Sequence, residues 1–188
     1  GSVKDKRITQ RVVDQFANVS PDLARQIAGR IGVNPPAQAP DVGAAASPAL
    51  SQANTIKTAR TRKVAVLVSE GFCARSVTAM LEALKAAGAA ADVLSTRLGM
   101  IAAHDGAQFE AVKDLTTASS LIYDGVYVPG GTGTASLAQD AAARAFVHEA
   151  FLHDKTIGAT HGGADVLAAS GAGSAPACGV VCVREAED

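Results

Sequence analysis

The stretch KVAVLVSEG, residues 63–71, is a continuous apolar run that ends in a polar Ser-Glu-Gly turn. A short strand that is apolar along its whole length is typical of a parallel sheet with both faces covered. A helical pattern follows, in which Val77, Met80 and Leu84 share one face. Gly88 then favours the end of this helix. The stretch therefore predicts the first strand and helix of an α/β fold.

The same alternation of strands and helices continues along the chain. Apolar runs predict strands at 91–94, 122–128, 156–160 and 179–183, and helical patterns lie at 140–153 and 163–169. Residues 98–112 predict a β-hairpin around His104-Asp105-Gly106, because Asp-Gly favours the tight turns of hairpins. Strands that alternate with helices predict a doubly wound α/β sandwich, with a mostly parallel sheet and helices on both faces.

The first part of the chain, residues 3–32, predicts two short amphipathic helices. In the first, apolar residues such as Ile8 and Phe16 fall on one stripe. The second is expected to begin after Ser20, a good N-cap residue, and to end at Gly32. Two such helices bury too little surface for a core of their own, so we expect their apolar faces to dock elsewhere.

Residues 33–60 have the composition of a linker. They hold four of the seven prolines, among Ala, Ser, Gln and Asn. We therefore divide the chain into a helical segment at 3–32, a linker at 33–60 and an α/β domain at 61–188. Gly1 and Ser2 are expected to be the remnant of a cleavage site.

The composition excludes several classes of protein. The formal net charge is −1 and no basic block is present, which argues against a nucleic-acid binder. No apolar run is long enough for a membrane span, and the N-terminal residues have no apolar signal region. The three cysteines do not have the spacing of a disulfide framework. We therefore expect a cytoplasmic protein that binds neither nucleic acid nor membrane.

Candidate site residues follow three of the predicted strands, where ligands bind in open α/β sheets. They are Glu70 after the first strand, Gly130 and Gly131 after the strand at 122–128, and Thr160 and His161 after the strand at 156–160. The last pair stands in the sequence Gly-Ala-Thr-His-Gly. That sequence has the spacing of a nucleophile elbow, with Thr160 in the nucleophile position.

Each of these residues also has a structural interpretation. A β-branched residue enters the strained backbone of an elbow poorly, so we expect Thr160 to form a local hydrogen bond in a relaxed turn. His161 has the chemistry of a base, but it has no partner nearby in sequence. Glu70 is either an acid with a shifted pKa or a solvated charge at a strand end, and we favour the second. Residues 130–134 either cradle a phosphate or form a tight turn, and we favour the turn.

The cysteines and the remaining histidines do not form an evident site. Cys73 stands at the start of a helix, where a thiolate is stabilised, but a packed thiol is the simpler interpretation. Cys178 and Cys182 fall on one face of a predicted strand and are expected to fill the core. Metal-ligand spacing is lacking among the other histidines, which are His104, His148 and His153. We therefore expect no metal site.

Four pieces of the α/β region resemble the DJ-1/PfpI branch of the class I glutamine amidotransferase-like folds. In chain order they are KVAVLVSEGF, HDGAQFEAV, YDGVYVPGG and IGATHGGADVL. The resemblance implies a flavodoxin-like sandwich, with Glu70 as the family's acid and Gly130 or Gly131 as a backbone oxyanion donor. Thr160 stands where the family has its cysteine nucleophile. We therefore expect a degenerate site, with no catalytic residue and no bound cofactor.

The segment KDKRITQRVVDQFANVSPDLARQIAGRIGVNPP, residues 4–36, resembles the end of the helical region of haem catalases. In large-subunit catalases, a linker and a DJ-1/PfpI-like domain follow that region, in the same order as here. The resemblance implies a parent homotetramer whose catalase core decomposes hydrogen peroxide on haem. No catalase active-site segment is recognised in this chain, whose only tyrosines are Tyr123 and Tyr127.

Two functions of different classes follow from these observations. The first is a non-catalytic domain of a catalase that aids stability and assembly and acts as a chaperone-like holdase toward unfolded client proteins. The alternative is a small-molecule hydrolase or glyoxalase that uses Glu70, Thr160 and His161. The resemblance also implies a closing helix beyond the last strand, so we expect part of one sheet face to be uncovered in a chain that stops at Asp188.

Overall fold

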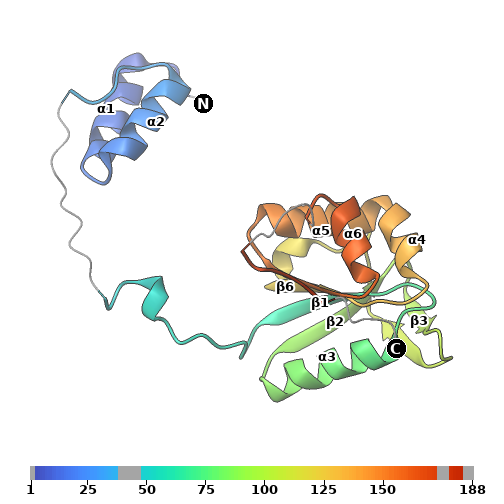
Figure 1. The fold of residues 1–188 in the computed structure, drawn as a ribbon. Helices are drawn as coiled ribbons and strands as arrows, with labels where there is room; N and C mark the ends of the chain where they lie inside the picture. The colour runs from blue at the N-terminus through green and yellow to red at the C-terminus, as the bar shows by residue number, and fades with distance from the viewer. Residues whose placement is uncertain (1–2, 38–47, 173–177, 184–188) are drawn as a thin grey trace. The chain divides into compact units, whose positions relative to one another are not determined.

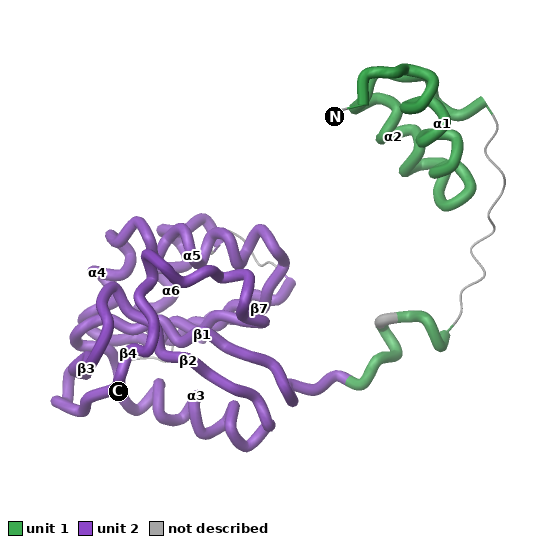
Figure 2. The backbone as a smooth tube through the Cα atoms, turned by 180° about the vertical axis from the view of Figure 1, so that it is seen from behind, with its two compact units in different colours: residues 1–56 green, residues 57–188 purple. Residues whose placement is uncertain are grey.

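A computed structural model describes residues 3–37, 48–172 and 178–183 of the chain. The chain divides into two compact units, residues 1–56 and residues 57–188 (Figure 2). Gly1 and Ser2, residues 38–47 of the predicted linker and the C-terminal residues 184–188 lie outside the described residues. Each unit has a hydrophobic core of its own.

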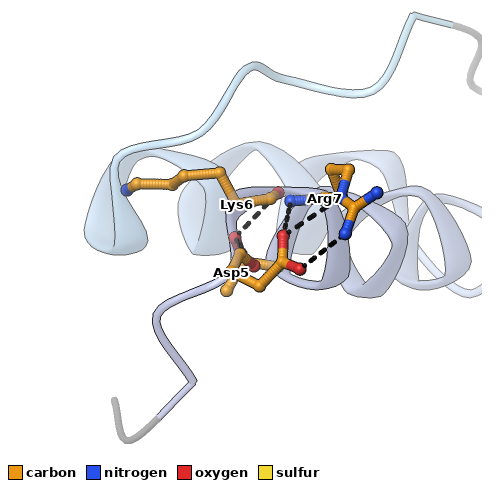
Figure 3. Close-up of polar contacts among 4 residues, drawn as sticks. Asp5, Lys6 and Arg7 are labelled. Carbon is orange, nitrogen blue, oxygen red and sulfur yellow. Dashed lines mark hydrogen bonds and ion pairs between the residues drawn. The ribbon is translucent and has the colours of Figure 1, made fainter.

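The first unit contains two helices, α1 (Lys6–Ala17) and α2 (Pro21–Ile31). The carboxylate of Asp5 caps α1, because it accepts a hydrogen bond of 2.9 Å from the backbone N–H of Arg7 and pairs with the Arg7 guanidinium at 3.1 Å (Figure 3). Ser20 caps α2, and Gly32 ends it in the left-handed conformation with φ of 65°. The predicted limits of the second helix are therefore confirmed.

The two helices contact each other through small residues. Their buried core consists of Val13, Ala17, Ala24 and Ala28. Of the predicted apolar stripe, Val13 lies in this contact, whereas Ile8, Val12 and Phe16 remain 49%, 42% and 38% exposed. The two helices therefore form a small core of their own, which corrects the prediction, while the rest of the stripe stays uncovered within the first unit.

The second unit is a six-stranded parallel sheet with helices on both faces, and the predicted fold class is confirmed. The strand order is β5-β2-β1-β6-β7-β8. The strands are β1 (Lys63–Leu67), β2 (Ala90–Ser95), β5 (Lys113–Asp114), β6 (Gly125–Val128), β7 (Thr156–Thr160) and β8 (Val180–Val183). The predicted hairpin is formed by the antiparallel strands β3 (Gly99–Ala102) and β4 (Gln108–Ala111).

Helix α3 (Ala74–Ala86) lies on one face of the sheet. On the other face lie α4 (Thr134–Gln139), α5 (Ala141–Leu152) and α6 (Gly163–Ala169) (Figure 1). Two core clusters separate the sheet from these layers, and β1 contributes to both: Leu67 packs toward α5 and α6, and Val66 packs toward α3 and the hairpin. This arrangement explains why the strand is apolar along its length.

The structure corrects the prediction in three further places. The strand predicted at 122–128 begins only at Gly125, because Ser120–Ile122 form a 3₁₀ turn that places the buried ring of Tyr123 before the strand. Helix α4 was not predicted, since six residues are too few for an amphipathic pattern. Strand β5 was missed because it has two residues. None of the described helices has the length and apolar character needed to cross a bilayer.

A charged network joins the first residues of β1 to β2 and β5. The carboxylate of Asp92 accepts from the ammonium groups of Lys63 at 2.7 Å and Lys113 at 3.0 Å, and from the hydroxyl of Tyr123 at 2.8 Å. Burial by itself raises the pKa of Asp92, but these hydrogen bonds outweigh it and lower the pKa to about 2. The same burial, together with the hydrogen bond to Asp92, raises the pKa of the Tyr123 hydroxyl.

This network predicts a specific loss of stability in acid. Folding lowers the Asp92 pKa from an ordinary value of 3.8 to about 2. The ionised carboxylate therefore stabilises the folded chain in full above pH 4, and this stabilisation is lost as the pH falls toward 2. The contribution amounts to about 2 kcal/mol of unfolding free energy. Urea denaturation at a series of pH values should show this slope in the native chain and a shallower slope in Asp92→Asn. Equal slopes in the two proteins would contradict the network's role.

Candidate functional site

The carboxyl ends of β1, β6 and β7 bring two loops into direct backbone contact. The N–H of Cys73 donates to the carbonyl of Gly130 at 2.8 Å, and Phe72 forms an isolated bridge with Gly131. The hydroxyl of Ser69 donates to the carbonyl of Gly133 at 2.6 Å. These contacts place the predicted Gly130–Gly131 turn against the loop that follows β1.

Glycine is required in this contact for reasons of space and conformation. Gly131 has φ of 127°, and a Cβ atom at this residue would stand 2.4 Å from the carbonyl oxygen of Gly71. A Cβ atom at Gly133 would stand 2.1 Å from the carbonyl oxygen of Glu70. The loop is therefore a tight turn that lets two backbones meet, as the sequence interpretation favoured.

The turn between β7 and α6 has its left-handed residue at His161, one position after the residue in the nucleophile position. His161 has φ of 49°, whereas Thr160 is the last residue of β7 and pairs with Val183 of β8. The N–H of His161 donates to the carbonyl of Val183 at 2.9 Å. Because of this bond, the pairing of β7 with β8 includes Thr160. The elbow residue is therefore His161, because strand pairing holds Thr160 in the extended conformation.

Thr160 was expected to form a local hydrogen bond, but its partner lies on the neighbouring strand. Its hydroxyl lies 2.9 Å from the hydroxyl of Tyr127 on β6. Burial raises the pKa of Tyr127, and the hydrogen bonds with Thr160 and Ser76 reduce that effect. On α3, the hydroxyl of Ser76 donates to the thiol of Cys73 at 3.2 Å. We call these four residues, Cys73, Ser76, Tyr127 and Thr160, the hydroxyl cluster.

Sequence reasoning missed Ser76 and Tyr127 as members of this cluster. Tyr127 was interpreted only as a buried strand residue, and Ser76 carries no motif. The one available signal was spacing: Ser76 lies one helical turn after Cys73, and Tyr127 lies two residues before the Pro-Gly-Gly turn. A sulfur and three hydroxyl groups in this arrangement form a chain of neutral hydrogen bonds, with no charged base among them.

Glu70 does not belong to the hydroxyl cluster. Its carboxylate is paired with the guanidinium of Arg97 and accepts from the backbone N–H of Ala102 at 2.9 Å. The hydrogen bond from Arg97, followed by that from Ala102, lowers the pKa of Glu70. The side chain remains 56% exposed. Glu70 is therefore an ionised, solvated group that joins the end of β1 to the hairpin.

A cavity of about 510 Å³ lies beside the hydroxyl cluster on the α3 face of the sheet. It is lined by Arg75, Ser76, Ala79, Met80, Ala83, Tyr127, Thr160, His161 and Val183. A second cavity, of about 520 Å³, shares Met80 and Tyr127 with it and continues toward the other end of the strands. Residues of α3, β6 and β7 line both cavities, and Val183 of β8 lines the first.

The remaining candidates are dispersed. Cys73 is half-buried at the N-cap of α3. The prediction that Cys178 and Cys182 fill the core is wrong, since both are exposed. Cys178 lies in the turn before β8, and Cys182 lies on β8, which among the described residues has a neighbouring strand on one side only. Among the described residues, no three His, Cys, Asp or Glu side chains gather as metal ligands would.

Comparison with known proteins agrees with both resemblances in the sequence. The model of the DJ-1/PfpI family matches residues 62–183. Catalase-2 of Bacillus subtilis is 42% identical over 189 residues, which are 100% of this chain and 27% of that protein. A catalase of Alkalihalophilus pseudofirmus is 39% identical over 163 residues, 87% of this chain and 24% of that protein. The chain thus spans about a quarter of the length of these catalases.

Among solved structures, DJ-1beta of Drosophila melanogaster superposes with a TM-score of 0.61 at 16% sequence identity. The match covers 66% of this chain and 82% of that one. At this identity the likeness concerns the fold alone, and it supports the flavodoxin-like arrangement of the second unit.

The position of the elbow predicts different costs for two glycine substitutions. Thr160→Gly should lower the unfolding free energy by more than about 1 kcal/mol, because it loosens a paired strand and removes a hydrogen bond. His161→Gly should lower it by less than Thr160→Gly does, because glycine adopts positive φ without strain. Urea denaturation of both variants provides the measurement. The opposite order of costs would place the elbow at Thr160.

The close contact of the two loops predicts a second pair of unequal costs. Gly131→Ala should lower the unfolding free energy by about 3 kcal/mol or more, because the new methyl group meets backbone atoms in a strained conformation. Gly99→Ala is the matched control, since Gly99 also has positive φ (92°) but has open space around its Cβ position. Gly99→Ala should lower the unfolding free energy by about 1 kcal/mol, because only the backbone strain at positive φ is added. Similar costs for the two variants would refute the contact.

Proposed function

The chain belongs to the DJ-1/PfpI family, and we propose that it serves as a non-catalytic C-terminal domain of a large-subunit catalase. The observation that carries the proposal is the match to Catalase-2, which covers 100% of this chain but 27% of that protein. The two helices of the first unit are included in that match. A chain of this kind contributes to the stability and assembly of a larger polypeptide whose chemistry takes place elsewhere.

The geometry of the candidate site supports a role without catalysis. An elbow nucleophile needs a hydroxyl or thiol at the residue with positive φ, and that residue is His161. The nearest hydroxyl, that of Thr160, is bonded to Tyr127. The carboxylate that would act as acid, Glu70, is ionised and bonded to Arg97. The hydroxyl of Thr160 and the carboxylate of Glu70 are therefore both engaged in other contacts.

The residues of the chain do not fit the haem of a catalase. In catalases a tyrosine phenolate binds the haem iron. Both tyrosines of this chain are buried, and their hydroxyl groups are engaged, Tyr123 with Asp92 and Tyr127 with Thr160. Burial raises the pKa of both hydroxyl groups, which disfavours a phenolate. The peroxide chemistry of the parent therefore belongs to its catalase core.

Two uncovered apolar surfaces suggest how the domain acts. One is the stripe of Ile8, Val12 and Phe16 in the first unit, and we assign it to the catalase core of the same polypeptide. The other lies around Val181 and Val183 of β8 in the second unit, and we assign it to unfolded client proteins. In this proposal the parent is a cytoplasmic homotetramer, and the domain adds holdase activity to its stabilising role.

The alternative function is a small-molecule hydrolase or glyoxalase of the DJ-1/PfpI type. The observation that favours it is the cavity of about 510 Å³ beside Thr160 and His161. Two observations weigh against it: Glu70 is not among the residues that line this cavity, and the hydroxyl of Thr160 is bonded to that of Tyr127. We therefore keep the catalase domain as the proposed function.

The proposal predicts the outcome of two parallel assays on the purified chain. Methylglyoxal should not be consumed above the uncatalysed rate, because no activated nucleophile is present. Light scattering by heat-treated citrate synthase should fall in proportion to the amount of chain added, and an equal mass of serum albumin serves as the control. Turnover that is abolished by Thr160→Ala or His161→Ala would overturn the proposal. If the chain left the light scattering by citrate synthase unchanged, the holdase part of the proposal would be refuted.

A further inference from the structure

The chain has two methionines, and they lie in different surroundings. Met80 lies on α3, is partly buried, and packs against the core cluster that contains Val77 and Tyr127. Met100 lies on β3 and is 49% exposed. The first methionine therefore belongs to the contact between a helix and the sheet, whereas the second is a surface residue.

The side chain of Met80 also borders two cavities that are open to solvent. It lines the cavity of about 510 Å³ beside the hydroxyl cluster and the neighbouring cavity of about 520 Å³. A water molecule occupies about 30 Å³ in the liquid, and hydrogen peroxide is not much larger. Peroxide can therefore reach the thioether sulfur of Met80 from the cavities, while the same side chain packs against the core.

We propose that Met80 is a site of oxidation by hydrogen peroxide, and that its sulfoxide loosens the packing of α3 on the sheet. The thioether sulfur attacks one peroxide oxygen, so that an S–O bond forms as the O–O bond breaks, and the other oxygen leaves with both hydrogens as water. The sulfur is oxidised and the peroxide is reduced, so no further reactant is needed. The inference rests on the proposed function for the source of the oxidant, because peroxide is the substrate of a catalase.

A sulfoxide group does not suit the position of the Met80 side chain. It is polar, and burial of a polar group against an apolar core without a hydrogen bond costs free energy. The neighbouring hydroxyl of Tyr127 is already bonded to that of Thr160. The oxidised side chain should therefore turn into the cavities and leave its contacts with the core. At Met100 the sulfoxide faces water, so its formation should leave the packing unchanged.

The test treats two variants of the 188-residue chain with hydrogen peroxide and compares their urea denaturation before and after. Met100→Leu retains only Met80, and Met80→Leu retains only Met100. Leucine conserves the volume of methionine, and both variants keep the three cysteines, so cysteine oxidation affects them alike. Peroxide should lower the urea midpoint of Met100→Leu by about 0.5 M more than that of Met80→Leu.

Measurements on the native chain remain informative if a variant fails to fold. Peptide mapping by mass spectrometry should find the added oxygen at Met80, and amide hydrogen exchange should rise in α3 but not in α5, on the other face of the sheet. Methionine sulfoxide reductases should restore the original exchange, because they reduce this product. Equal falls of the midpoint in the two variants, unchanged exchange in α3, or a Met80 that stays reduced while Met100 is oxidised would overturn the inference.

Failure of this inference and failure of the proposed function are distinguishable, because the peroxide is added and its effect does not depend on a catalase core. If Met80 is oxidised and α3 loosens, but the chain consumes methylglyoxal through Thr160, the oxidation site stands and the non-catalytic function fails. If methylglyoxal is not consumed and Met80 stays reduced, the proposed function stands and this inference fails.

Discussion

The loop after β1 and the loop after β6 meet backbone to backbone, and the hydroxyl groups of Ser69 and Thr132 add hydrogen bonds to backbone carbonyls across the contact. Gly131 and Gly133 permit this approach, because any Cβ atom at either residue would collide with the facing backbone. The contact fixes the carboxyl ends of the two strands side by side, and β7 follows β6 in the sheet. The positions of Cys73, Tyr127 and Thr160 around one point depend on it.

The polar groups at that point bond to one another beside the cavity of about 510 Å³. The hydroxyl cluster satisfies its own hydrogen bonds, and Glu70 is held by Arg97 at the hairpin. A site that performs acid–base or nucleophilic catalysis usually contains a group with a pKa poised for its task. Here the resolved shifts move the pKa values of Glu70 and Tyr127 away from neutrality. The fold has therefore kept the geometry of a site whose groups are engaged elsewhere.

The sequence predicted the parallel sheet, the hairpin and the limits of α2, because continuous apolar runs, an Asp-Gly turn and the caps Ser20 and Gly32 are local signals. Contacts between residues that are far apart in the chain could not be predicted from these local signals. The pairing of Thr160 with Val183 moves the elbow to His161, and the edge position of β8 exposes Cys182. The role of Ser76 likewise depends on a fold that brings α3 to β6, which its own sequence neighbourhood does not reveal.

The central claim is that this chain stabilises a catalase without taking part in its chemistry. The most direct measurement removes the matching region from Catalase-2 of Bacillus subtilis and compares the shortened enzyme with the intact one. We predict equal peroxide turnover per haem at moderate temperature and faster thermal inactivation of the shortened enzyme, with loss of tetramer. Equal inactivation rates, or a loss of turnover in an intact tetramer, would contradict the claim.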